Sequence, residues 1–237
     1  MRCGLYGKLP AKRDYVALGT PREFLAAWEP WLQGGISASR ISLGPAWQGA
    51  FLKAPIWRFW LGRDVSGAAT TGALMPSVDG VGRYFPLTLF VRAEANESLP
   101  PPEIDPQDGW MEQLEDVLLS ALSPDAAVEG VLANLESLGG PVPRPAATPP
   151  EGIDRVAQGA WSMALPADGI APAAAKLRLA DRERACAGLS FWWTQGGDGF
   201  APCILMSSLM PDPALYAAML TGDLSDGGSS TTASHAP

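Results

Sequence analysis

Three residue types that hydrolases use lie within seven positions of one another, namely Ser77, Asp79 and Arg83. They belong to the stretch GALMPSVDGVGRYFPLTLFV, residues 72–91. A serine hydroxyl can act as a nucleophile, a carboxylate as a general base, and a guanidinium as a stabiliser of negative charge. One hypothesis is therefore a small hydrolase that uses Ser77 or a carboxylate such as Asp79 or Asp14.

The groups that would activate such a serine are absent from the part of the chain expected to fold. The single histidine, His235, lies in a polar C-terminal tail, and none of the four lysines follows a serine at SxxK spacing. No phosphate-binding glycine motif is present, since in GLYGKL only two residues separate the glycines. We therefore predict no catalytic residues, no enzyme activity and no cofactor.

A metal site is not predicted either. The three cysteines have no CxxC spacing, so a cysteine-based zinc site and a disulfide framework are both disfavoured. The acidic residues of the C-terminal half lie mostly on expected helix faces or in linkers, not at the loop spacing that oxygen-ligand metal sites require.

The same stretch also has a structural interpretation. Asp79 and Arg83 are four residues apart and can form an ion pair that braces the turn, while Pro76, Gly80 and Gly82 fix its backbone. Alternatively, Arg83 and Tyr84 face an anionic or phosphorylated partner, because guanidinium groups bind such groups well. We expect bracing to come first and binding second.

Charge is divided unevenly along the chain. The net charge is −8, with +6 in residues 1–92 (11 Lys/Arg, 5 Asp/Glu) and −14 in residues 93–237 (6 Lys/Arg, 20 Asp/Glu). Either the two halves attract each other or the basic half meets an acidic partner. Nucleic acid is disfavoured, because no dense basic stripe is present.

The sequence contains no apolar run of the length that spans a bilayer, and its start lacks the apolar segment of a signal peptide. We therefore expect a cytoplasmic protein without membrane insertion.

Strand and helix patterns alternate along the chain. A helix from residue 20 is predicted with Thr20 as its cap and a break or kink at Pro30, and another with Ser123 as its cap. A final short helix is predicted with Asp212 as its cap. Strands are predicted at residues 5–6, 15–18, 56–61, 70–75, 85–91, 159–165, 189–195 and 201–209, and helices at 20–32, 44–54, 110–122, 123–138, 171–187 and 212–220.

This alternation predicts the α/β class: a mixed β-sheet with helices on both faces, a three-layer α/β/α sandwich, ending in a C-terminal antiparallel hairpin. We expect one domain over residues 1–222. It comprises a motif-bearing half (1–92), a helical hairpin with Pro-rich linkers (93–152) and a C-terminal α/β half (153–222). Residues 223–237 are predicted to be a disordered tail.

Three tryptophans are assigned structural roles: Trp57, Trp192 and Trp193. Because neighbours on a strand point to opposite faces, one of Trp192 and Trp193 must lie off the main core face.

Five ordered stretches resemble the TagF family, the accessory proteins encoded with bacterial type VI secretion systems. They are YGKLPAKRDYV, PWLQGGISASR, APIWRFWL, GALMPSVDGVGRYFPLTL and, more loosely, GLSFWW. The first four cover Tyr6 to Leu89 nearly continuously. The chain departs from the family pattern at Arg13-Asp14-Tyr15, and at Gly80, where many relatives have a longer basic residue.

The resemblance implies a compact α/β fold and a cytoplasmic, non-enzymatic regulator. Family members are post-translational repressors of type VI secretion assembly, and some bind a forkhead-associated scaffold protein. On this basis the surface around Lys8, Asp14, Asp79, Arg83 and Tyr84 is the expected contact with a secretion component. A structural accessory subunit of the apparatus is the further alternative.

Overall fold

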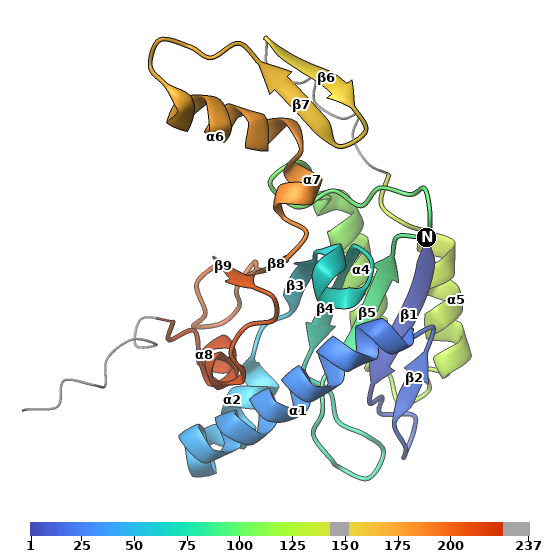
Figure 1. Ribbon diagram of the computed structural model, residues 1–237. Coiled ribbons are helices and arrows are strands. Elements are labelled where there is room, and N and C mark those ends of the chain that lie inside the picture. The colour runs from blue at the N-terminus through green and yellow to red at the C-terminus, as the bar shows by residue number, and fades with distance from the viewer. Residues whose placement is uncertain (143–151, 225–237) are drawn as a thin grey trace, which may run out of the picture.

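The structure, a computed structural model, describes residues 1–142 and 152–224 (Figure 1). Within these residues, seven strands form one sheet in the order β2-β1-β5-β4-β3-β8-β9. The strands are β1 (Arg2–Gly7), β2 (Val16–Leu18), β3 (Trp57–Leu61), β4 (Thr70–Met75), β5 (Leu87–Arg92), β8 (Leu189–Thr194) and β9 (Cys203–Ser208).

Every pairing in this sheet is antiparallel, so the prediction of a mixed sheet is wrong. The physical reason lies in the connections. A parallel pair needs a crossover of a dozen or more residues, whereas β3, β4 and β5 follow one another through short links. The link from β3 to β4 carries only the short helix α3 (Arg63–Ser66). The strands β8 and β9 pair with each other in antiparallel register, from Leu189 opposite Ser208 to Thr194 opposite Cys203.

Aromatic helices cover one face of the sheet. They are α1 (Arg22–Leu43), α2 (Trp47–Lys53) and α8 (Tyr216–Thr221), with 3₁₀ turns at Gly44–Ala46 and Pro213–Leu215. From α1, Phe24 stacks on Phe90 of β5 with ring centroids 4.1 Å apart, and Trp31 lies 4.6 Å from Trp192 of β8. This face therefore holds an aromatic core.

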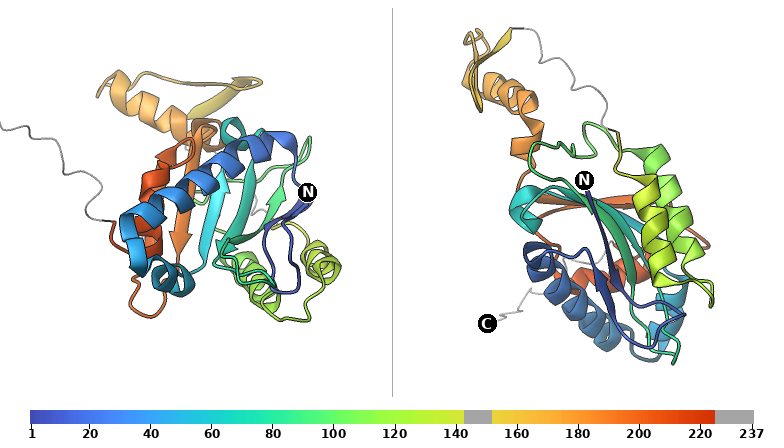
Figure 2. Two further views of the ribbon diagram at one scale, coloured as in Figure 1. Left: turned by 90° about the horizontal axis from the view of Figure 1, so that it is seen from below. Right: turned by 90° about the vertical axis from the view of Figure 1, so that its right-hand side faces the viewer.

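The opposite face is covered by α4 (Asp108–Ser120) and α5 (Val128–Leu138), whose apolar residues are mostly aliphatic. Leu114 and Leu118 of α4 and Leu135 of α5 are fully buried against the sheet. Figure 2 shows the sheet between α1 and the α4–α5 pair in its right-hand view. Because helices cover both faces, β4 is buried at every position, which removes the alternation of an exposed strand.

Helix starts are less well predicted than strands. Pro21, not Thr20, precedes α1 and provides no side-chain cap, and α5 begins at Val128 rather than after Ser123. The helix α1 runs on through Pro30, because Trp28 and Trp31 on either side are buried in the core. By contrast, the predicted Asp212 cap is present, since its side chain accepts a hydrogen bond from the Ala214 amide.

A small unit stands away from the sheet at the top of Figure 1. It consists of a two-stranded ribbon, β6 (Ile153–Ala157) and β7 (Ala160–Met163), followed by α6 (Ile170–Ala180) and α7 (Arg182–Ala185). The strand β6 was not predicted, and its residues after Ile153 are exposed. Most of the predicted linker at residues 141–150 and most of the predicted tail lie outside the described residues.

Candidate functional site

The turn between β4 and β5 closes as a small antiparallel loop. Val78 and Tyr84 form an isolated bridge, and the Phe85 amide donates to the Ser77 carbonyl at 3.0 Å. The Gly82 amide donates to the Asp79 carbonyl at 2.9 Å, and Gly82 has a φ of 85°, which L side chains resist. Glycine at this position is therefore required by the backbone.

Asp79 is the centre of the turn, and its side chain is fully buried. Its Oδ1 accepts hydrogen bonds from the backbone amides of Val81 (3.0 Å) and Arg83 (2.9 Å). Its Oδ2 accepts from Lys8 Nζ at 2.9 Å and from Arg83 Nε at 2.7 Å. The structure thus contains the predicted Asp79–Arg83 ion pair and adds a second cation to it.

These donors fix the charge of Asp79. Burial by itself raises the pKa of a carboxyl group, but the hydrogen bonds from Arg83, Lys8 and Val81 outweigh it and hold the pKa of Asp79 well below its ordinary value. The carboxylate is consequently ionised at neutral pH, with both oxygens occupied.

The turn is tied to the β1–β2 loop at residues 8–15. Lys8 is itself buried, and the Gly80 amide donates to the Lys12 carbonyl at 2.9 Å. The Arg83 guanidinium also donates to the Arg13 carbonyl. Gly80 does not have the positive φ expected of it. A Cβ there would lie 3.0 Å from the Pro10 carbonyl oxygen, so glycine permits close approach of the two loops.

Tyr84 braces the turn from the other side. Its half-buried ring packs edge-on against Trp47 and Phe51 of α2, each with a centroid separation of 5.9 Å. Its hydroxyl accepts a hydrogen bond from Gln48. Asp14, in contrast, is exposed on the β1–β2 loop and takes no part in the contacts of Asp79. The structure therefore brings together four of the five predicted contact residues and leaves Asp14 apart.

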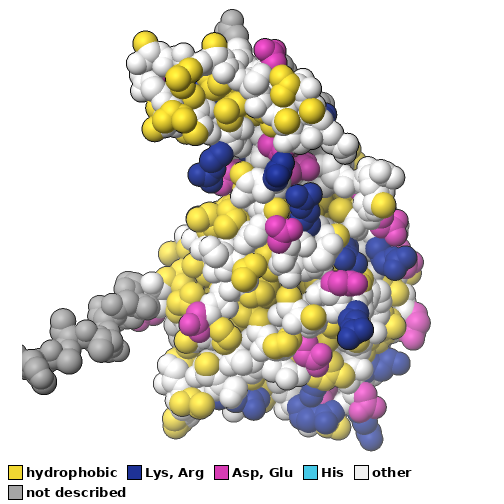
Figure 3. All heavy atoms as spheres, in the orientation of Figure 1, with side chains coloured by type: hydrophobic (Ala, Val, Ile, Leu, Met, Phe, Trp, Pro, Cys, Tyr) yellow, Lys and Arg dark blue, Asp and Glu magenta, His cyan; other side chains and the backbone are white. Residues whose placement is uncertain are grey.

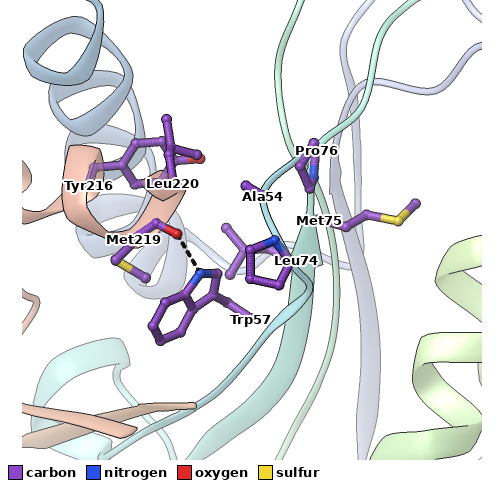
Figure 4. A pocket seen from close by; sticks show the side chains of 9 residues that line it. Ala54, Trp57, Leu74, Met75, Pro76, Tyr216, Met219 and Leu220 are labelled. Atoms are coloured by element: carbon purple, nitrogen blue, oxygen red, sulfur yellow. Dashed lines mark hydrogen bonds between the residues drawn. The ribbon is translucent and has the colours of Figure 1, made fainter. Parts of the chain in front are cut away.

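Ser77 is buried, with 2% of its surface exposed. Pro76, next to it, lines a small apolar cavity with Trp57, Leu74 and Met219 (Figure 4). The cavity has a volume of about 10 Å³, enough for roughly one water molecule. The Trp57 indole donates to the Met219 carbonyl at 2.9 Å and joins β3 to α8.

The two adjacent tryptophans of β8 point to opposite sides of the sheet, as their spacing requires. Trp192 is fully buried under α1 and donates to the Ser190 hydroxyl. Trp193 packs partly buried with the residues of the α4–α5 face.

Sequence reasoning missed Arg58, a buried cation on β3. Its Nε lies 2.6 Å from Glu115 of α4, and a second nitrogen lies 3.7 Å from Asp108. The signal available in the sequence was an arginine in the otherwise apolar run WRFWL.

Across residues 1–142 and 152–224, no group of three or more His, Cys, Asp or Glu side chains is arranged to hold a metal ion. None of the helices in the same ranges combines the length and apolar character that a membrane crossing requires.

Comparison with known families identifies the chain. The N-terminal domain of TagF, described as type VI secretion system-associated, matches residues 4–138. This chain belongs to the TagF family. The matched region contains the whole network around Asp79, from Lys8 to Tyr84, as well as the α4–α5 hairpin.

Among solved structures, the TagF chain is similar to the crystal structure of PA0076 from Pseudomonas aeruginosa PAO1. The two share 34% sequence identity with a TM-score of 0.74, over 99% of this chain and 100% of PA0076. A comparison with curated proteins gave no match. The similarity to PA0076 therefore extends beyond the matched N-terminal domain and includes the C-terminal third.

Proposed function

We propose that this TagF-family chain is a non-enzymatic regulator that represses assembly of the type VI secretion system by binding one of its components in the cytoplasm. The observation that carries the proposal is the match of the family domain to residues 4–138. The braced turn supports a binding role, because a fixed loop pair presents its exposed side chains at little cost in conformational entropy.

The contact surface that we assign to this role is formed by the β1–β2 loop and the β4–β5 turn. Lys12 and Arg13 are exposed, the Arg83 side chain is 57% exposed, and Val81 is 54% exposed. Lys8 and Asp79 are buried beneath this surface and act by holding it. Of the residues expected as contacts, Lys8 and Asp79 thus form a buried brace, and Asp14 and Arg83 are exposed.

The hydrolase alternative is poorly supported by the same geometry. A nucleophile must reach its substrate, whereas Ser77 is buried with 2% of its surface exposed. A general base must be free to accept a proton, whereas both oxygens of Asp79 are occupied by four donors.

The partner that the family suggests is a secretion-system component, with a forkhead-associated scaffold protein as the specific candidate. Binding can be tested by co-purification of the scaffold with tagged wild-type chain and with Lys12→Glu and Arg13→Glu variants. We expect both variants to lose the scaffold and to release secretion in cells. The matched control is Arg63→Glu. Arg63 lies on α3, and its side chain is 62% exposed.

If Lys12→Glu and Arg13→Glu repress secretion as well as wild type does, this surface is not the contact. Ser77→Ala distinguishes the hydrolase hypothesis from the binding hypothesis. If this variant loses repression but keeps scaffold binding and its melting temperature, Ser77 has a catalytic role and binding alone does not explain repression. A structural accessory subunit would instead co-purify with the assembled apparatus at fixed stoichiometry.

A further inference from the structure

An apolar groove lies beside the braced turn and was not anticipated from the sequence. It has a volume of about 330 Å³ and is lined by Gln33, Ile36, Ser37, Arg40 and Ile41 of α1 together with Phe85. Ile36 and Phe85 are 7% and 8% exposed and form its apolar lining, whereas Ile41 is 83% exposed. This volume is at the small end of the roughly 300–1,000 Å³ range of ligand pockets, so it suits one or two side chains.

The groove is continuous with the contact surface proposed above. The Phe85 ring lies 4.6 Å from the ring of Tyr15 on the β1–β2 loop. On the other side, the Arg40 guanidinium lies 4.3 Å from the centre of the Trp47 ring, and Trp47 packs edge-on against Tyr84. One surface therefore runs from Tyr15 across Phe85 to Arg40.

This end of the molecule is basic. Residues 8–15, 29–53 and 79–85 contain six Lys/Arg and three Asp/Glu. Lys8 and Asp79 form a buried pair, which leaves five Lys/Arg against the two acids Asp14 and Glu29. Several Lys and Arg side chains lie along the lower edge of the face in Figure 3, at the end of the molecule that holds the β4–β5 turn. The charge of the surface therefore complements an anionic segment, and its apolar groove complements an apolar side chain.

The arrangement of the cations decides between two kinds of anion. A phosphorylated residue concentrates its charge and favours several converging donors. Here Arg83 is paired with Asp79 and donates to the Arg13 carbonyl, and Lys8 is buried against Asp79. The Arg40 guanidinium lies over the Trp47 ring. The exposed charges are consequently spread along the surface, which suits a run of carboxylates better than one dianionic group.

We propose that the groove between the C-terminal half of α1 and Phe85 binds an Asp/Glu-rich peptide segment of the partner, with one apolar side chain of that segment seated on Ile36 and Phe85. The acidic residues would lie towards Arg40 and Arg13. They would avoid Glu29, which accepts a hydrogen bond from Gln33 at 3.0 Å. This inference rests on the proposed function, because it names the chemistry of the partner that the same surface would recognise.

The test uses the full chain and a fluorescein-labelled decapeptide of Asp and Glu with one central leucine, titrated by fluorescence anisotropy. We expect saturable binding that weakens as salt is added, because exposed charges carry part of the affinity. Arg40→Glu should weaken binding by about fivefold or more. Ile41→Ser should weaken it by about fivefold through loss of apolar contact.

Matched controls exist elsewhere in the chain. Arg63→Glu makes the same charge change on α3, and Ile170→Ser makes the same apolar change on α6, where Ile170 is 76% exposed. Both controls should bind the peptide as wild type does. Circular dichroism and the melting temperature of each variant establish that a loss of binding is not a loss of fold.

Several outcomes would overturn the proposal. These are no binding of the acidic peptide, equal binding of the peptide with serine in place of leucine, and equal weakening by the control variants. Tighter binding of a phosphothreonine peptide of otherwise neutral sequence would assign the groove to a phosphorylated partner instead. Sedimentation of the chain as a dimer that Arg40→Glu dissociates would assign it to a second copy, whose residues 93–142 contain eleven Asp/Glu and no Lys/Arg.

Failure of this inference is distinguishable from failure of the proposed function. If the peptide binds as expected but Arg40→Glu represses secretion normally, the groove is an acidic-peptide site and the proposed role of the surface in repression is wrong. If Arg40→Glu releases secretion while no acidic peptide binds, the surface has its regulatory role and the peptide chemistry is wrong.

Discussion

At the scale of single residues, Asp79 is the most heavily connected group of the candidate site. One carboxylate receives two backbone amides, a lysine and an arginine that come from two separate loops. Its side chain is fully buried, so a partner could not touch it directly. It holds in place the exposed side chains that we propose as contacts.

Replacing Asp79 with Asn should destabilise the fold. The substitution keeps the volume but removes the negative charge and leaves Lys8, whose side chain is 10% exposed, without its counter-charge. We expect a loss of about 2–3 kcal/mol in the free energy of unfolding, measured by urea denaturation. Asp14→Asn is the matched control, because Asp14 is exposed, and it should change stability by less than about 0.5 kcal/mol.

The low pKa of Asp79 also predicts how that difference varies with pH. Because the pKa is lower in the folded state than in the unfolded chain, the ionised group stabilises the fold fully above the unfolded pKa of about 4. That stabilisation is lost as pH falls further towards the folded pKa. The gap in urea midpoint between wild type and Asp79→Asn should therefore shrink from pH 5 to pH 3. A gap that stays constant would contradict the assignment.

At the scale of elements, the α4–α5 layer is joined to the sheet by apolar packing and by the charged contacts of Arg58 with Glu115 and Asp108. Arg58 is 1% exposed on β3, and it contacts Glu115 of α4 at 2.6 Å. A buried cation is costly unless it is paired, so the two residues are strongly coupled.

A double-mutant cycle on Arg58 and Glu115 tests this coupling. Glu115→Met alone leaves a buried guanidinium with a weaker partner and should cost about 3 kcal/mol. Arg58→Met combined with Glu115→Met replaces both charges with apolar groups and should cost less than the single change, in urea denaturation. Additive effects of the two substitutions would show that the residues act independently.

Elements also differ in how well the sequence predicts them. The runs at β3, β4 and β5 are apolar and bounded by turn residues, and their predicted positions agree closely with the structure. The Thr20 and Ser123 caps are predicted from capping motifs, which depend only on residues next to each other in the sequence. In the structure, neither residue immediately precedes its helix, and tertiary packing of the aromatic residues determines where α1 runs.

At the scale of the whole molecule, the sheet and its two helical layers form one packed body, and the ribbon β6–β7 with α6 stands apart from it (Figure 1). The contrast in burial is strong. All six residues of β4 are buried, whereas β6 is exposed after its first residue, and α6 buries Ala173 alone among its residues.

Hydrogen exchange should separate these two parts. Amides of β6 and β7 are expected to be protected at least about 100-fold less than those of β4 and β5, because local opening of an exposed ribbon breaks few packed contacts. The measurement is native-state exchange followed by mass spectrometry at peptide resolution. Equal protection of the two parts would mean that the ribbon unfolds only with the whole domain.

The sequence by itself determined those features that depend on residues close to one another along the chain. It predicted the α/β class, most strands, the Asp79–Arg83 pair four residues apart, and membership of the TagF family through ordered motifs. Periodicity and turn chemistry are local properties, so a single chain shows them without a fold.

Only the tertiary structure decided those features in which segments far apart in the sequence come into contact. Lys8 and Asp79 are 71 positions apart, and their contact turns a local ion pair into a brace between two loops. The antiparallel order of the sheet, the burial of Ser77 and the groove between α1 and Phe85 are likewise set by packing. Such contacts form because the whole core excludes water and fixes which surfaces face each other, and no local pattern encodes that choice.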